Sequence, residues 1–139
     1  MNRFSRATVL ADGCQTRYLR TGTGPTVLFL VPVESDKATA AETVVQSLSH
    51  RFRFIVPEVP GNVCNGTIAT PVWIRGLLDG LGLQSVVLLA DASLRSHAID
   101  IGLADPERIR GVTLVDLQSP EAPTVGNALE RLTENSTPA

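Results

Sequence analysis

A serine and a histidine that could take part in ester cleavage lie close to one strand-to-helix junction, and an acid that could complete the set follows a later strand. Residues 86–97 read VVLLADASLRSH, an apolar strand followed by a segment of helical composition. Many hydrolytic enzymes present a nucleophile at a sharp junction of this kind. Ser93 and His97 are four residues apart, which would place them on one face of a helix, and Asp116 follows a later strand. The three residue types match a nucleophile, a base and an orienting acid.

Each of these side chains also has a structural interpretation. Ser93 can cap the helix that begins beside it, and Asp116 can accept hydrogen bonds from backbone N–H groups at its strand end. His97 would have to point into a cleft to act as a base, whereas a helix directs it along its own surface. Asp91 and Asp100 are further acids close to His97. The residues alone leave both a hydrolytic site and a structural junction open.

Other kinds of chemistry are not predicted. Cys14 and Cys64 lie far apart and match no metal-binding spacing, and His50 is expected to be a solvated residue at a helix end. The glycine pairs at 22–24 and 80–82 lack the third glycine of a dinucleotide-binding loop. The acids form no cluster that would ligate a cation. We therefore expect no metal and no cofactor.

Size and composition favour one globular domain. The chain has 139 residues, of which 43% are hydrophobic, and its formal net charge is -2. No basic stripe indicates nucleic-acid binding. No signal-peptide pattern and no apolar run of membrane-spanning length are present, so we expect a soluble, cytoplasmic protein that does not bind membranes. We expect the domain to cover residues 1–133 and to end in a flexible tail at 134–139.

Strand and helix patterns alternate along the chain. An Asp12-Gly13 turn joins two alternating segments into an antiparallel hairpin, and the later strands are apolar throughout, as in a parallel sheet. The expected strands are 6–11, 15–20, 26–33, 53–59, 85–90 and 111–116, and the expected helices are about 38–50, 71–82, 94–103 and 125–132. This order predicts a three-layer α/β fold with a mostly parallel sheet of about six strands and helices on both faces.

The helix after residue 70 has the clearest boundaries. Thr70 is expected as its N-cap and Pro71 in its first helical position. Gly80 and Gly82 are expected to end it. We expect its apolar side chains, including the only tryptophan, to be core residues: Val72, Trp73, Leu77, Leu78 and Leu81.

Four segments in family order resemble the α/β-hydrolase superfamily, in the branch of esterases, epoxide hydrolases and haloalkane dehalogenases. They are GTGP at 22–25, IVPEVPG at 55–61, the helix at 73–83, and DPERIRG at 105–111 with LVD at 114–116. The resemblance covers roughly residues 10–117. It implies the strand order 1-2-4-3-5-6, two further strands, and a nucleophile on a Gly-x-Ser-x-Gly turn.

The family's nucleophile turn is altered in this chain. Without a gap, the nucleophile position falls on Ala92, and Ala90 and Leu94 replace the flanking glycines. A shift of one residue would make Ser93 the nucleophile, with Asp91 and Arg95 in the glycine positions. The resemblance therefore indicates a degenerate turn.

Two further parts of the family's machinery are also replaced. The His-Gly pair after the third strand corresponds to Val31 and Pro32, and proline has no N–H to stabilise an oxyanion. The family's histidine follows the eighth strand, whereas this chain stops soon after the counterpart of the sixth. We therefore interpret the chain as a shortened, non-catalytic pseudoenzyme that serves as a binding, regulatory or assembly subunit.

Two alternative functions remain open at this stage. One is a hydrolase of esters or thioesters that uses Ser93 with His97, or with a histidine from a partner. The other is a binder of small apolar or acyl molecules in the vestigial cleft at the carboxyl ends of the strands. The walls of that cleft would be Val33, Glu34, Ala92, Ser93, Asp116 and Leu117.

The last strand, at 111–116, is expected to be an open edge of the sheet. It contains neither lysine nor proline, which commonly protect such edges. The segment 125–132 could fold back over it, a second copy could pair with it across a two-fold axis, or another protein could supply further strands. We expect a homodimer or a heteromeric complex with its interface on residues 111–132.

Overall fold

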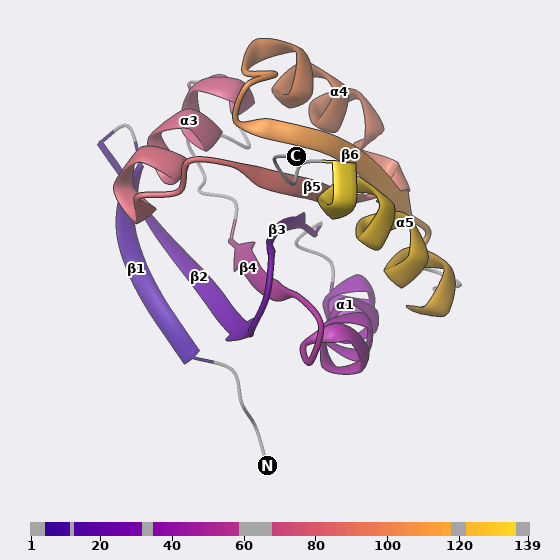
Figure 1. Cartoon of the computed structure of the whole chain (residues 1–139). Helices are drawn as coiled ribbons and strands as arrows, with labels where there is room; N and C mark the ends of the chain where they lie inside the picture. Colours follow the sequence, from indigo (N-terminus) through magenta and orange to yellow (C-terminus); the bar gives the residue numbers. More distant parts are fainter. Residues whose placement is uncertain (1–4, 12, 32–34, 59–67, 118–121, 136–139) are drawn as a thin grey trace.

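The computed structural model describes residues 5–11, 13–31, 35–58, 68–117 and 122–135, and within them strands and helices follow the predicted order (Figure 1). The strands are β1 Ser5–Ala11, β2 Cys14–Gly22, β3 Thr26–Leu30, β4 Arg53–Pro57, β5 Val86–Asp91 and β6 Ile109–Val115. The helices are α1 Ser35–Leu48, α3 Thr70–Leu81, α4 Arg95–Ala104 and α5 Ala122–Asn135, and a 3₁₀ turn at Ala92–Leu94 precedes α4.

The strands form one sheet in the order β1-β2-β4-β3-β5-β6. β1 pairs with β2 and β2 with β4 in antiparallel fashion, while β4, β3, β5 and β6 run parallel to one another. The predicted fold is therefore confirmed: a mostly parallel six-stranded sheet with an antiparallel hairpin at its N-terminal side. No helix in the described ranges is both long and apolar enough to cross a membrane.

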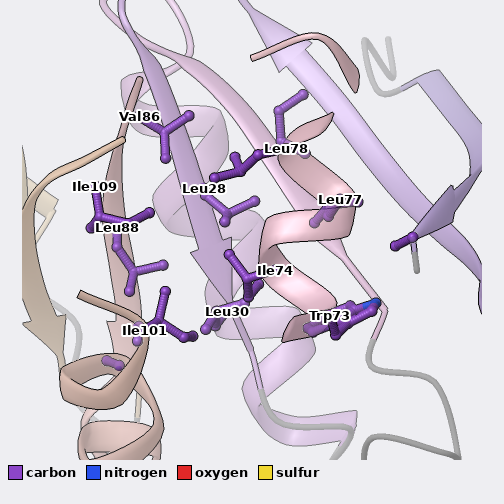
Figure 2. Packing of buried hydrophobic residues seen from close by; sticks show 14 of the residues in the cluster. Leu28, Leu30, Trp73, Ile74, Leu77, Leu78, Val86, Leu88, Ile101 and Ile109 are labelled. Carbon is purple, nitrogen blue, oxygen red and sulfur yellow. The ribbon is translucent and has the colours of Figure 1, made fainter. Parts of the chain in front are cut away.

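Helices cover both faces of the sheet, and each face has its own hydrophobic cluster. α3 and α4 pack on one face, where Figure 2 shows Leu28 and Leu30 of the sheet beside Ile74 of α3. α1 and α5 pack on the other face. Successive β5 residues alternate between the clusters, and every residue of β5 is buried. This double burial explains why β5 reads as an unbroken apolar run.

The start of α3 differs from the prediction. Ala69, not Thr70, is the N-cap residue, and Thr70 is already helical. Gly82, with a φ of 69°, ends the helix in the left-handed conformation that glycine adopts without strain. Gly80 does not end the helix but lies inside it, where a Cβ would approach Val9 Cγ2 to 2.7 Å. The glycine therefore allows α3 to pack closely against β1.

The apolar side of α3 is correctly predicted except at one position. Trp73 is fully buried, and its indole N–H donates to the Thr16 hydroxyl at 2.9 Å. This bond satisfies the polar end of a large core residue. Val72 is 43% exposed, so its assignment to the core is wrong, and Ile74 is buried two residues later.

The DPER segment at 105–108 connects α4, α3 and β6. The Arg108 guanidinium donates to Asp79 near the end of α3 at 2.6 Å and to the Leu83 carbonyl at 2.6 Å. Its own carbonyl accepts from the N–H of Val86, the first residue of β5, at 2.8 Å. Arg108 therefore joins the start of β6 to α3 and to β5, which is a structural role for this segment.

The last helix is longer than predicted. α5 runs from Ala122 to Asn135, so it includes two residues of the segment predicted as a tail. The Arg51 side chain after α1 forms an ion pair with Glu130, which links α5 to α1 on the same face of the sheet. Leu132 packs directly over Gly111 of β6, where a Cβ would lie 2.5 Å from its Cδ2.

Candidate functional site

The junction between β5 and α4 lies at the carboxyl edge of the parallel strands, where ligands bind in open α/β sheets. β5 ends at Asp91, the 3₁₀ turn occupies Ala92–Leu94, and α4 begins at Arg95. Asp91 is the N-cap of the turn, with extended φ and ψ of -60° and 144°. The predicted strand-to-helix junction is therefore present, and a capped 3₁₀ turn forms it.

Asp91 is the central residue of this junction. Its carboxylate is 2% exposed and accepts hydrogen bonds through both oxygens. Oδ2 accepts from the backbone N–H of Ser93 at 3.1 Å and also from the Ser93 hydroxyl. Oδ1 accepts from the backbone N–H of Leu117 at 3.0 Å. The carboxylate thus joins the turn after β5 to the segment after β6, and these three donors offset the cost of its burial.

Ser93 therefore has a local structural role in this arrangement. The prediction that Ser93 caps the helix is wrong: Asp91 is the N-cap of the turn, Leu94 is the N-cap of α4, and Ser93 donates its backbone N–H and its hydroxyl to the Asp91 carboxylate. A nucleophilic serine instead directs its hydroxyl to a base that can accept the proton during attack. Here the partner is an aspartate whose second oxygen already holds a backbone group.

His97 has a different neighbour. Its ring Nδ1 lies 3.5 Å from the Thr70 hydroxyl on α3, and the side chain is exposed. Ser93 belongs to the 3₁₀ turn and His97 to α4, so the four-residue spacing does not run along one regular α-helix. The structure gives Ser93 and His97 separate partners, Asp91 and Thr70.

The remaining predicted site residues are dispersed. Ala92 and Asp116 are exposed at the carboxyl ends of β5 and β6. Leu117 is 3% exposed and belongs to the cluster beneath α1 and α5, which is a core position, not a cleft wall. Val33 and Glu34 lie outside the described residues. The structure therefore brings only part of the predicted cleft together.

Asp91 is the important residue that the sequence interpretation did not assign. Its Oδ1 holds the backbone N–H of Leu117, the residue that follows Asp116. The available signal was the Asp-Ala-Ser order, in which an acid two residues before a serine favours a capped turn. No group of three or more metal-ligating side chains occurs within the described part of the chain.

Solved structures share this fold. No protein-family model and no curated protein matches the sequence. An epoxide hydrolase from Vigna radiata is 22% identical with a TM-score of 0.66, over 83% of this chain and 41% of that one. A carboxylesterase from Bacillus subtilis is 16% identical with a TM-score of 0.68, over 82% of this chain and 43% of that one.

A membrane phospholipase A is also similar, with 16% identity, a TM-score of 0.69, and coverage of 81% of this chain and 39% of that one. Neighbours of this kind, together with the strand order, show that the chain has the α/β-hydrolase fold. The chain spans 39–43% of the length of these three structures. Fold similarity at this level of identity leaves the chemistry to be argued from the site.

Proposed function

We propose that this protein is a non-catalytic α/β-hydrolase-like chain that acts as a binding or assembly subunit. The observation that carries the proposal is the Asp91–Ser93 contact, because it places the only hydroxyl of the turn in a structural bond. A methyl group, that of Ala92, occupies the position where the family resemblance expects a nucleophile.

The residues around the turn support the same proposal. The side chain of Leu94 stands where the resembling enzymes have the second glycine of the turn, and in the register shifted by one residue Arg95 takes that position. Preorganised N–H donors contribute about 10²–10³ in rate to acyl transfer. Pro32 can supply no such donor at its position.

The scaffold itself is well formed. Both faces of the sheet have continuous hydrophobic clusters, and β5, which leads into the turn, is buried throughout. The altered turn is therefore not accompanied by a loss of the core. A scaffold that keeps its core without a nucleophile is suited to present surfaces to other molecules.

The test is hydrolysis of a p-nitrophenyl ester, an acyl thioester and an epoxide by the purified protein. The ester and the epoxide correspond to the carboxylesterase and the epoxide hydrolase among the structural neighbours. We expect rates equal to those of buffer. Ser93→Ala removes the hydroxyl of the turn, and Ser96→Ala is the matched control, an exposed serine in the first turn of α4. Turnover that Ser93→Ala abolishes and Ser96→Ala preserves would overturn the proposal.

A further inference from the structure

The β6 edge of the sheet has a regular run suited to further pairing. Among the described residues, β6 pairs with β5 alone. The register shifts between Val86 and Val87, because Val86 pairs with Ile109 and Val87 with Gly111, so Arg110 is an extra residue in a bulge. After the bulge, residues 111–115 pair regularly, and Thr113 is the centre of this run.

Apolar side chains lie beside this edge on the α4 face. His97 contacts Thr70 of α3, so it marks the side of α4 that faces α3. At about 100° per residue around a helix, Ile99 projects from the opposite side, toward the β6 edge. Ile99 is 44% exposed, Leu103 one turn later is 77% exposed, and Leu114 of β6 is 37% exposed. We call these three residues the α4–β6 patch.

A strand directly after α5 does not readily complete this edge. α3 connects β4 to β5 and α4 connects β5 to β6, so on their face of the sheet the chain advances toward β6. α1 connects β3 to β4 on the other face, where the chain advances away from β6. α5 lies on the face of α1 (Figure 1). A parallel strand that followed α5 and lay beside β6 would therefore need a left-handed crossover, which is rare.

We propose that a second copy of this chain pairs antiparallel with β6 about a two-fold axis at Thr113, so that two sheets become one. This deepens the proposed function by naming the partner. In this register Val112 lies opposite Leu114 of the second copy, and the same pair recurs across the axis. Two apolar cross-strand pairs on the α4 face then stabilise the ladder.

The charges at the ends of the run are self-complementary. Arg110 precedes the regular ladder, and Asp116 follows it. In the Thr113-centred register Arg110 of one copy and Asp116 of the other come to the same end of the ladder, so opposite charges flank the apolar pairs at both ends. Opposite charges directly across an antiparallel pair are favourable, and like charges are not.

The position of α4 fits the same axis. α4 packs on both β5 and β6. The two copies of α4 would therefore lie about two strand spacings apart, roughly 10 Å. Helices pack at about 8–10 Å, so Ile99 and Leu103 would fill the space between the two copies. The α4–β6 patch thereby becomes the apolar part of the interface.

The first test is sedimentation equilibrium at micromolar concentration and moderate salt. We expect a mass of twice 14.8 kDa for the wild type. Leu114→Lys places two like charges near the axis and should raise the dissociation constant about 100-fold or more. Leu10→Lys is the matched control, since Leu10 is 66% exposed on β1, the other edge strand, and this variant should stay dimeric. A monomeric wild type, or a dimer equally stable in Leu114→Lys, would overturn the inference.

The second test fixes the register by charge reversal. Arg110→Glu alone and Asp116→Arg alone should each weaken the dimer, and the double variant should restore it, because the opposed pairs are re-formed with inverted sign. Failure of the double variant to recover, with circular dichroism showing folded protein, would reject this register. Neither assembly experiment measures hydrolysis, so the two proposals can be separated. A monomer without esterase activity would reject the dimer but would not contradict the proposal that the chain is non-catalytic.

Discussion

α3 and α4 cover the same face of the sheet, yet they bury very different amounts of apolar side chain. α3 places Trp73, Ile74, Leu77 and Leu78 in the core. α4 buries Ala98 and Ile101 and leaves Ile99 and Leu103 exposed. The contrast indicates that α3 is stabilised within the chain, whereas α4, next to β6, has apolar side chains that are exposed.

The comparison predicts the largest loss of stability for a substitution in the buried side of α3. Trp73→Ala should lower the free energy of unfolding by about 3–5 kcal/mol, because it leaves a large cavity and deprives the Thr16 hydroxyl of its indole donor. Urea unfolding at one fixed protein concentration measures it. Val72→Ala on the same helix is the control and should change stability by less than about 0.5 kcal/mol. Equal losses in the two variants would contradict the assignment of the core.

The second effect concerns the junction that leads into α4. Asp91→Asn keeps the size of the side chain but sets an amide NH₂ against one of the groups that now donate to the carboxylate. We expect a loss of about 1–3 kcal/mol in unfolding free energy. Asp100→Asn, on the exposed surface of α4, is the control. An unchanged stability for Asp91→Asn would show that the carboxylate does not hold the junction.

A smaller effect is expected from the serine itself. Ser93→Ala removes one hydrogen bond to a carboxylate and should lower the unfolding free energy by about 0.5–1.5 kcal/mol. Ser96→Ala should be neutral. If both variants unfold like the wild type, the Ser93 hydroxyl has no structural role, and the argument against its use in chemistry weakens.

The smallest predicted effect on folding concerns Leu103, an exposed apolar residue of α4. Leu103 is 77% exposed, so Leu103→Gln should change the unfolding free energy of the monomer by less than about 0.5 kcal/mol. The same variant should weaken the dimer measurably in sedimentation. A large loss of monomer stability would instead place Leu103 in the core of its own chain.

The sequence predicted the fold because its main signals are local. The apolar run of β5, the hairpin pattern of β1 and β2 and the spacing of Trp73 and Leu77 each depend on neighbouring residues, and all identified the correct element. Boundaries were less accurate where propensity competes with packing. Thr70 is a good capping residue, but α3 begins at Thr70 itself, with Ala69 as the N-cap. The Thr70 hydroxyl faces His97 instead.

The site was harder to predict because its decisive contact is long-range. The sequence suggested Ser93 as either a nucleophile or a cap, whereas in the structure Asp91 is the cap and Ser93 donates to it. The Asp91–Leu117 bond joins residues 26 positions apart and depends on β5 and β6 being neighbours in the sheet. Only the folded arrangement shows that one carboxylate holds both the turn and the end of β6.

The most direct test of the central claim is the intact mass of the protein after incubation with a serine-reactive fluorophosphonate. If the Ser93 hydroxyl stabilises the turn and is not a nucleophile, the mass should stay at that of the unmodified 14.8 kDa chain. A stoichiometric adduct that maps to Ser93, and that is absent from Ser93→Ala, would contradict the account.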